Sequence, residues 1–294
     1  MPPRSPSTPA AEPQPDQTAE PPREGPASAP SLLLTVLGEF VHPRGGQVWT
    51  GTLVEALGAL GVEPKAARQA LARTAAEGLL SSQRQGRRVR WSLTDQGARL
   101  LEEGTQRIYG FMREPHAWDG QWLVLTVGVP ESQRRLRHRM RTRLTWLGLG
   151  SPAPGVWVVP DASKETAVHE VVAELGLGDR AFAWVGRAGR IGDPAKVIRA
   201  AWDVDDVEAR YLRFVDRFQE AVADTDREAF VQQVLLIQEW RRFPFSDPDL
   251  PAELLDHDWP GPVAAAVFHD RRNRWHRRAQ AEWDRMDADA GSRI

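Results

Sequence analysis

Cysteine is absent from the 294 residues, and lysine is nearly absent. Without a thiol the chain has no disulfide framework, no thiol nucleophile and no thiolate zinc site. Of the 38 basic residues only Lys65, Lys164 and Lys196 are lysine, and the other 35 are arginine, a bias typical of GC-rich coding. Because 40 acidic residues nearly balance the basic ones, a partner has to be inferred from local charge and not from overall basicity.

Long apolar runs are also lacking. The most apolar uncharged stretch, residues 144–160, is 17 residues long and contains three glycines and three prolines. It is too short and too broken for a bilayer-spanning helix. The N-terminus shows no apolar segment after a basic start, so no secretory signal is visible. We expect a soluble cytoplasmic protein with no membrane partner.

Catalytic and metal-binding motifs are missing as well. There is no P-loop, no G-x-S-x-G, and the glycines within residues 186–192 do not form a dinucleotide fingerprint. His169 begins an HEVVA run that lacks the second histidine of a metalloprotease. His269 and His276 lack a third ligand at suitable spacing. We expect no catalytic residues, no metal and no cofactor.

Residues 1–30 differ in composition from the rest. They contain 10 of the 23 prolines and almost no large apolar side chain. Such a segment cannot bury enough surface to offset the entropy of ordering, so we predict a disordered tail. The remaining 264 residues suffice for two or three small cores.

Residues 31–110 show the element order of a winged helix-turn-helix. Apolar spacing predicts a helix from Ser31, which is a plausible N-cap. A second helix over 52–60 opens with a capping box of Thr52 and Glu55, and a third over 64–77 has Pro64 at its first position and Gly78 after its end. Residues 81–94 predict a hairpin turning at Gln85-Gly86, and Thr94 caps a further helix to about residue 103.

The third helix and the hairpin carry a pattern suited to duplex DNA. Arginine and lysine donate to guanine, glutamine to adenine, and an alanine methyl contacts thymine. The candidate DNA-binding residues of the helix are Lys65, Arg68, Gln69, Ala72 and Arg73. The hairpin adds guanidinium groups suited to phosphate or minor-groove contact, those of Arg84, Arg87, Arg88 and Arg90. The alternative is a solvated hairpin on a winged helix that binds protein.

Residues 118–189 read as a strand, helix, strand, helix and strand. The run QWLVLTVGVP is typical of a buried strand, and GVWVVP and RAFAWVGR read as two more. Amphipathic helices are predicted over 131–147 and 163–175. This order predicts a small central ferredoxin-like domain. From Pro194 onward the pattern is helical, and we predict an all-helical C-terminal domain over 194–286, so that the fold class is α+β.

Two further basic clusters lie outside the hairpin. Residues 134–143 hold six arginines and His138, with Glu131 as the only acid facing them. They form a solvated helix face, a DNA-backbone contact or a site for ligand phosphates. Residues 240–245, WRRFPF, interleave arginines with aromatic rings and have Arg210 and Tyr211 on a preceding helix. They stack on a flat or phosphorylated ligand, or they form a buried structural network.

Together these blocks resemble the PaaX family of bacterial transcriptional repressors of phenylacetate catabolism. The resemblance runs from about Ser31 to Phe268. It rests on the WTGTLVEALGALGVEPKAARQALARTAAEGLL block, the hairpin, the DGQWLVLTVGVPESQRRLRHRMRTRLTWLGLGSPAPGVWVVP block and the EWRRFPFSDPDLPAELL block, in that order. It implies the three domains above, a central domain similar to small CRISPR-associated nucleases, and a dimeric repressor released from its DNA operator by phenylacetyl-CoA.

The resemblance also assigns candidate residues. Lys65, Arg68 and Gln69 fall in the family's recognition-helix block, and Arg87 and Arg88 in its wing. The candidate effector-binding residues are Arg210, Tyr211, Glu239, Trp240, Arg241, Arg242 and Phe243. Many members have a histidine before that glutamate, where this chain has Gln238, so its effector and its pathway differ if that histidine contacts the ligand.

A nucleic-acid-processing enzyme built on the central domain is the alternative from another class. Asp119 is the only acid near the first central strand, and one carboxylate does not build a metal nuclease site. The sequence therefore favours a ligand-responsive DNA-binding repressor.

Overall fold

The computed structural model describes residues 27–113 and 118–292 and combines helices with two antiparallel sheets, as the predicted α+β class requires. Residues 1–26, most of the predicted disordered tail, lie outside the described residues. The predicted start of order at Ser31 is wrong by two residues. The first helix begins at Ala29, and Ser28 caps it by accepting a hydrogen bond from the Ser31 amide.

The N-terminal elements follow the predicted order of helices and hairpin. They are α1 (Ala29–Val36), a π-helical turn (Leu37–Val41), a 3-10 turn (His42–Arg44), β1 (Gln47–Trp49), α2 (Thr50–Ala59), α3 (Pro64–Ala76), β2 (Leu80–Gln85), β3 (Arg88–Leu93) and α4 (Asp95–Gly110). The three strands form an antiparallel sheet in the order β1-β3-β2. Strand β1 was missed, because three residues are too few to show a period, and α4 is longer than predicted.

Three of the predicted helix boundaries are confirmed. Pro64 occupies the first turn of α3, Gly78 follows α3 with a φ of 78°, and Thr94 caps α4 by accepting from the Gly97 amide at 3.0 Å. The capping box in α2 is wrong because α2 begins two residues earlier, at Thr50. Thr52 instead donates to Asp287 of the last helix at 2.8 Å.

The hairpin turn is also displaced. β2 continues through Gln85, so Gly86 and Arg87 form the two-residue turn, with Gly86 at a φ of 63°. Of the two turn residues only Gly86 has positive φ, as in a type II′ turn, and glycine adopts this conformation without strain.

The central part comprises β4 (Gln121–Val127), α5 (Arg134–Trp146), β5 (Gly150–Ala153), β6 (Val156–Val159), a 3-10 turn (Ala162–Lys164), α6 (Glu165–Glu174), a 3-10 turn (Gly178–Arg180) and β7 (Ala181–Arg187). The four strands form one antiparallel sheet in the order β5-β6-β4-β7. Strand β5 was not predicted, because its Gly-Ser-Pro-Ala sequence has no strand propensity. Its position at the sheet edge tolerates the proline.

The C-terminal part consists of α7 (Pro194–Ala201), α8 (Val204–Phe218), α9 (Asp226–Trp240), α10 (Phe243–Ser246), a 3-10 turn (Ala252–Leu254) and α11 (Gly261–Ser292). The segment FPFS forms the short helix α10, with Pro244 in its first turn. The capping box of α9 pairs Thr225 with Glu228. No helix of the described residues is long and apolar enough to span a bilayer.

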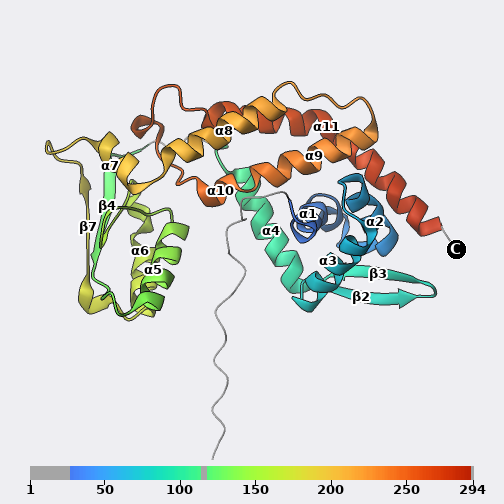
Figure 1. Cartoon of the computed structure of the whole chain (residues 1–294), viewed down its shortest axis with the longest axis horizontal. Helices are drawn as coiled ribbons and strands as arrows, with labels where there is room; N and C mark the ends of the chain where they lie inside the picture. Colours follow the sequence, from blue (N-terminus) through green and yellow to red (C-terminus); the bar gives the residue numbers. More distant parts are fainter. Residues whose placement is uncertain (1–26, 114–117, 293–294) are drawn as a thin grey trace, which may run out of the picture.

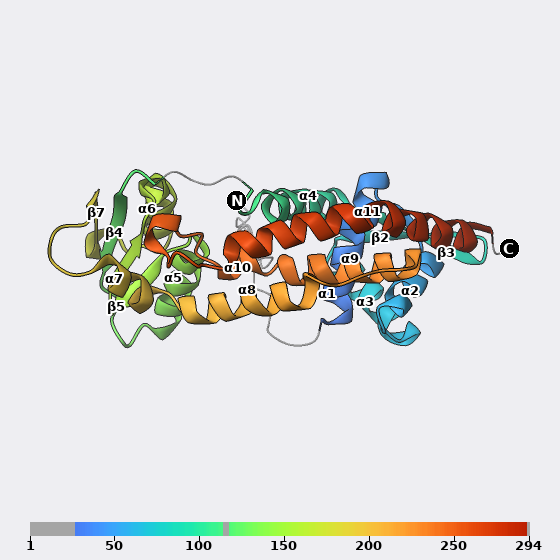
Figure 2. The same ribbon diagram turned by 90° about the horizontal axis from the view of Figure 1, so that it is seen from above.

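Helices α8, α9 and α11 run side by side as a beam that joins two lobes (Figures 1 and 2). The N-terminal helices and the hairpin lie under one end of the beam, and the four-stranded sheet lies at the other end (Figure 1). α5 and α6 cover one face of this sheet, around Leu123, Leu125 and Trp157. The opposite face packs through Trp122 and Val158 on the helical part.

The beam completes the core of the N-terminal lobe. The rings of Phe40 and Trp283 of α11 stack with centroids 5.2 Å apart, and Phe230 of α9 lies 5.0 Å from Phe40. All three side chains are buried. The N-terminal helices are therefore held on the beam by aromatic packing and not by surface contacts alone.

Two glycines of α4, Gly97 and Gly104, provide a matched test of how α4 packs against the backbone of Leu79. A Cβ at Gly97 would overlap the carbonyl oxygen of Leu79, whereas a Cβ at Gly104 would meet nothing within 4 Å. We expect Gly97→Ala to lower the free energy of unfolding by about 1–3 kcal/mol. Gly104→Ala should raise it by about 0.5–1 kcal/mol, because alanine loses less backbone entropy in a helix. Urea denaturation of both variants measures this, and equal effects at the two positions would contradict the packing of α4 on Leu79.

Candidate functional site

One face of α3 is polar and exposed, and the other is buried. Ala67, Ala70, Leu71 and Thr74 face the core of the N-terminal lobe. The exposed side chains of the helix include all five predicted DNA-binding residues, Lys65, Arg68, Gln69, Ala72 and Arg73. The small buried alanines hold α3 close to its neighbours, so the polar face stands clear of the lobe. Arg73 donates to Glu77 at 2.9 Å, and both side chains remain largely exposed.

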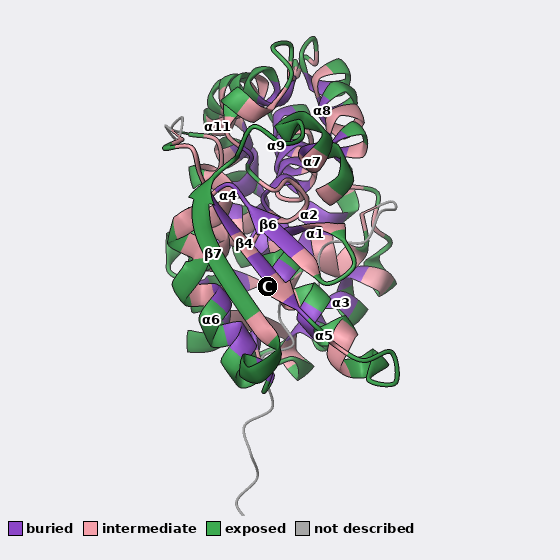
Figure 3. Ribbon diagram, turned by 90° about the vertical axis from the view of Figure 1, so that its left-hand side faces the viewer, coloured by how far each residue is buried: buried purple, intermediate pink, exposed green. Residues whose placement is uncertain are grey.

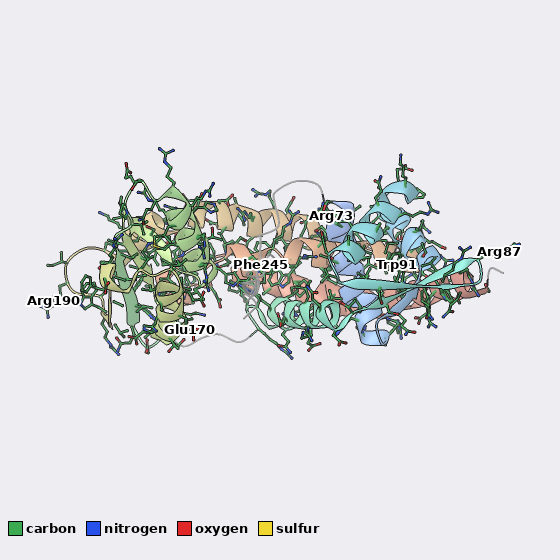
Figure 4. All side chains as sticks on the ribbon, turned by 90° about the horizontal axis from the view of Figure 1, so that it is seen from below. Arg73, Arg87, Trp91, Glu170, Arg190 and Phe245 are labelled. Carbon is green, nitrogen blue, oxygen red and sulfur yellow. The ribbon has the colours of Figure 1, made fainter. Side chains whose placement is uncertain are left out.

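The four hairpin arginines fall into two pairs. Arg84 and Arg87 are exposed, and Arg87 lies at the tip of the hairpin, far from the beam's other end (Figure 4). Arg88 and Arg90 are half-buried, and their guanidinium groups lie 4.5 and 5.3 Å from the ring centroid of Trp49. Of the four, only Arg84 and Arg87 are exposed, and Arg84 also donates to the Gly86 carbonyl at 3.0 Å.

Arg88 also holds the end of α11. Its guanidinium donates to the carbonyl oxygens of Ala290, at 3.2 Å, and Gly291. These carbonyls lie in the last turn of the helix, where the macrodipole favours a cation. The contact between Arg88 and the end of α11 could not be predicted, because it joins positions 202 residues apart.

The aromatic members of the predicted effector cluster are buried in the beam. The rings of Tyr211 and Phe243 stack at 4.2 Å, and Trp240 stacks on Phe268 at 4.6 Å. Tyr211 and Trp240 have no exposed surface, and Phe243 is 4% exposed. These three side chains fill the core between α8, α9 and α11 and leave no open stacking surface.

The charged members of that cluster have different surroundings. Arg241 donates to the Ser31 carbonyl at 3.3 Å and to the Thr35 hydroxyl at 3.0 Å, which ties α9 to α1. Burial lowers the pKa of Arg241 to about 10. Glu239 pairs with Arg217, and burial raises the pKa of its carboxyl group. Arg242 is half-buried beside them.

Arg210 lies apart from this group, in a cleft between the helical part and the central sheet. It forms an ion pair with Asp206 of the same helix. From α5, one arginine of the 134–143 run, Arg141, lines the same cleft. Arg137 and Arg143 of that run instead form ion pairs with Glu131 and Glu174.

A buried polar network that the sequence did not indicate centres on Glu39 in the π-helical turn. Its carboxylate accepts hydrogen bonds from Tyr109 of α4 at 2.5 Å, Gln233 of α9 at 2.7 Å and Arg272 of α11 at 3.2 Å. Burial and the Glu39 charge raise the pKa of Tyr109. The side chain of Glu39 is 5% exposed, so these partners compensate its desolvation.

Asp119, the acid near the first central strand, stabilises the turn that precedes β4. Its carboxylate accepts from the Gln121 amide at 2.8 Å, and its carbonyl accepts from Arg187. Within residues 27–113 and 118–292 no group of three or more histidine, cysteine, aspartate or glutamate side chains is arranged to hold a metal ion.

The chain was compared with families of known proteins. Residues 28–97 match the family described as PaaX-like protein, residues 115–198 the PaaX protein central Cas2-like domain, and residues 202–285 the PaaX-like protein C-terminal domain. The chain is 34% identical to the transcriptional repressor PaaX of Escherichia coli K12 over 256 residues, which cover 81% of this chain and 78% of that protein. The chain belongs to the PaaX family.

A solved structure shares the fold. The uncharacterized protein Rv0674 from Mycobacterium tuberculosis superposes with a TM-score of 0.62 at 24% identity, over 87% of this chain and 99% of the other. The three family matches and the 34% identity to the Escherichia coli repressor confirm the resemblance inferred from the sequence blocks.

The Tyr211–Asp247 contact generates a pH-dependent prediction. Tyr211 donates to the Asp247 carboxyl group at 2.5 Å, and burial raises the pKa of Asp247 to about 6, from an ordinary value of 3.8. The folded protein therefore holds this proton more tightly than the unfolded chain. The resulting stability is complete below about pH 4 and is lost as the pH rises through 6.

We expect Asp247→Asn to remove this dependence. Relative to the variant, the wild-type free energy of unfolding should fall by up to about 3 kcal/mol between pH 4 and pH 7. Denaturant titrations at several pH values measure the difference. Glu253→Gln, at an exposed nearby carboxyl group, is the control, and parallel pH profiles for wild type and Asp247→Asn would refute the shift.

Proposed function

We propose that this protein is a ligand-released transcriptional repressor that binds duplex DNA through a winged helix-turn-helix formed by α1 to α4. The single observation that carries the proposal is the exposed polar face of α3, backed by a buried apolar face and flanked by a basic hairpin. A regulator is favoured over an enzyme because the curated relative is named a transcriptional repressor. In this reading α3 enters the major groove and the hairpin is the wing.

The remainder of the chain is interpreted in the same scheme. The β-α-β-β-α-β order and the strand order β5-β6-β4-β7 support a ferredoxin-like central domain. The helices from Pro194 onward form the C-terminal effector domain. The protein acts in the cytoplasm on an operator, and its effector is an aryl- or acyl-CoA thioester such as phenylacetyl-CoA. The alternative is a different effector and a different pathway, because this chain has Gln238 where many family members have a histidine.

Base reading and phosphate contact are assigned to different residues. In the proposal Arg68 reads a base edge, and Arg87, exposed at the wing tip, contacts phosphate. Arg88 is not the best phosphate probe, because it holds the end of α11. Removing Arg68 should therefore change specificity, and removing Arg87 should weaken binding to all sequences.

We expect Arg68→Ala to cost about 1–3 kcal/mol on the promoter upstream of the protein's own gene and little on random duplex. Arg87→Ala should weaken both equally and lower the salt slope by about one. Gel-shift titrations at three salt concentrations measure both effects. Arg190→Ala, at the opposite end of the molecule, is the control (Figure 4). Equal loss on both duplexes for Arg68→Ala would remove its base-reading role.

The repressor is further proposed to be a homodimer, joined through the free edge of β7. Within the described chain β7 pairs only with β4, on one side. Its outer strip is exposed, in contrast to buried β4 and β6 (Figure 3). Phe182 and Trp184 are 63% and 56% exposed, and their rings stack at 6.4 Å. An exposed apolar edge strand is a ready template for another strand.

The sequence of β7 is compatible with antiparallel pairing to β7 of a second copy of the chain. Antiparallel pairing about a two-fold axis at Trp184 places Phe182 opposite Gly186 of the second chain. A Cβ at Gly186 would meet nothing within 4 Å, so this position leaves room for the ring. A two-fold dimer presents two winged helices to two DNA half-sites.

Trp184→Lys should convert the dimer to a monomer, because a charge on an edge strand opposes strand pairing. We expect the mass measured by light scattering at micromolar concentration to fall by half. Val222→Lys replaces another exposed apolar residue, in the loop between α8 and α9, and should leave the mass unchanged. A wild-type monomer, or an unaltered dimer in Trp184→Lys, would exclude this interface.

A further inference from the structure

A cleft of about 560 Å³ lies where the helical part meets the central sheet. This volume is within the range of pockets that hold small organic ligands, and such sites favour domain junctions. The residues that line it come from α5, β5, β6, the α7–α8 segment and the α10 region. It therefore spans the boundary between the matched central stretch, which ends at residue 198, and the C-terminal stretch, which begins at 202.

On the α7–α8 side the cleft is bordered by the indole ring of Trp202, which its contacts hold in place. Trp202 packs flat against the backbone of Gly150, where a Cβ would overlap the ring. Its Nε1 donates to the Gly148 carbonyl at 3.2 Å. The absence of a side chain at Gly150 thus allows the ring to approach the edge strand, and a planar apolar surface borders the cleft.

A second tryptophan that lines the cleft has a buried donor without a partner among the described residues. Trp157 lines the cleft and is 3% exposed, and its Nε1–H has no hydrogen-bond partner among the described residues. An unsatisfied buried donor costs about 1–3 kcal/mol, so a ligand oxygen that reached Nε1 would remove this cost. The Arg141 guanidinium lies 5.8 Å from the Trp157 ring centroid.

The arginines of the cleft differ in their partners. Arg199 is paired with Asp205 and Asp256, and Arg210 with Asp206. Arg141 forms no ion pair within the part of the chain that the structure describes. Its charge is therefore available to an anion or a polarised carbonyl oxygen.

We propose that this cleft is the effector site, and that it takes an acyl compound whose flat apolar group lies against Trp202 and whose carbonyl or carboxylate oxygen faces Arg141 and Trp157. The proposal rests on the function proposed above and locates the ligand outside the buried aromatic cluster of Tyr211, Trp240 and Phe243. A thioester and a free carboxylate share this chemistry.

The position of the cleft also connects it to the DNA-binding lobe. Ser246 and Pro248 line the cleft, and the neighbouring Phe245 lies 5.2 Å from the ring of Trp146. Arg107 of α4 covers both rings, at 4.5 and 4.4 Å, and donates to the Pro244 carbonyl at 2.9 Å. Because α4 begins directly after the wing strand β3, a ligand that shifts α5 against α10 acts on the element that carries the wing.

Isothermal titration calorimetry on the full-length protein without DNA tests the site. The probes are phenylacetyl-CoA, coenzyme A and phenylacetate, which separate the thioester from its two parts. Arg141→Gln removes the free charge, and Thr145→Trp fills the cleft from the exposed face of α5. The matched controls are Arg139→Gln and Thr142→Trp, at exposed positions of the same helix outside the cleft.

We expect Arg141→Gln to weaken binding of the probe that wild type binds by about tenfold or more, the effect of losing a charge-assisted hydrogen bond. Thr145→Trp should weaken it at least as much, because its ring occupies the space of the ligand. Both controls should stay within about twofold of wild type. Equal affinities in cleft and control variants, or no binding of any probe by wild type at millimolar concentration, would overturn the proposal. Gel shifts without ligand test DNA binding separately, so failure of the repressor function is distinguishable from failure of the site.

Discussion

The stacking of Trp283 on Phe40 is the contact on which the arrangement of the molecule depends. The N-terminal helices leave an apolar face that α9 and α11 complete, through Phe230, Val234 and Trp283. Truncating a buried tryptophan or phenylalanine to alanine costs about 3–5 kcal/mol, a large part of the stability of a typical domain. The N-terminal lobe and the beam are therefore thermodynamically linked, and Glu39 reinforces the link. Its carboxylate would be buried without compensation if α4, α9 or α11 withdrew their donors.

Local chemistry made much of the fold predictable. Pro64, Gly78 and Thr94 mark helix boundaries because each acts within its own turn, and the family blocks identified the relationship. The short strands β1 and β5 could not be predicted, because three or four residues are too few to show a hydrophobic period. Each is a strand only because it pairs with a neighbouring strand. The capping box was wrong because α2 begins at Thr50, which places Thr52 inside the helix, where it donates to Asp287, 235 residues away.

The site shows the same division between local and distant information. The polar face of α3 follows from helical spacing, so its exposed residues were identified from the sequence. The aromatic residues around Trp240 have equally suggestive chemistry, but only packing reveals that Tyr211 and Phe243 close on each other. The cleft was not predictable, because Arg141, Trp157 and Trp202 meet only when three separate segments assemble. The need for glycine at position 150 becomes evident only from the structure, where the Trp202 ring occupies the space of a Cβ.

The two joints of the beam differ in strength, and this difference bears on regulation. The N-terminal joint combines the aromatic core, the Glu39 network and the Arg88 clamp on the end of α11, a helix of 32 residues that extends about 48 Å. The joint to the central sheet rests on a smaller buried set, Trp122, Val158, Ile198, Val204 and Leu250. The sheet is therefore joined to the beam by a smaller buried contact than the N-terminal lobe is. The proposed effector cleft lies at this joint, and a ligand there changes the equilibrium by its differential affinity for the two arrangements. If β7 joins two copies, rotation of each beam on its sheet changes the separation of the two proposed winged helices while each N-terminal lobe stays intact. Release from DNA then requires no change in α3 itself.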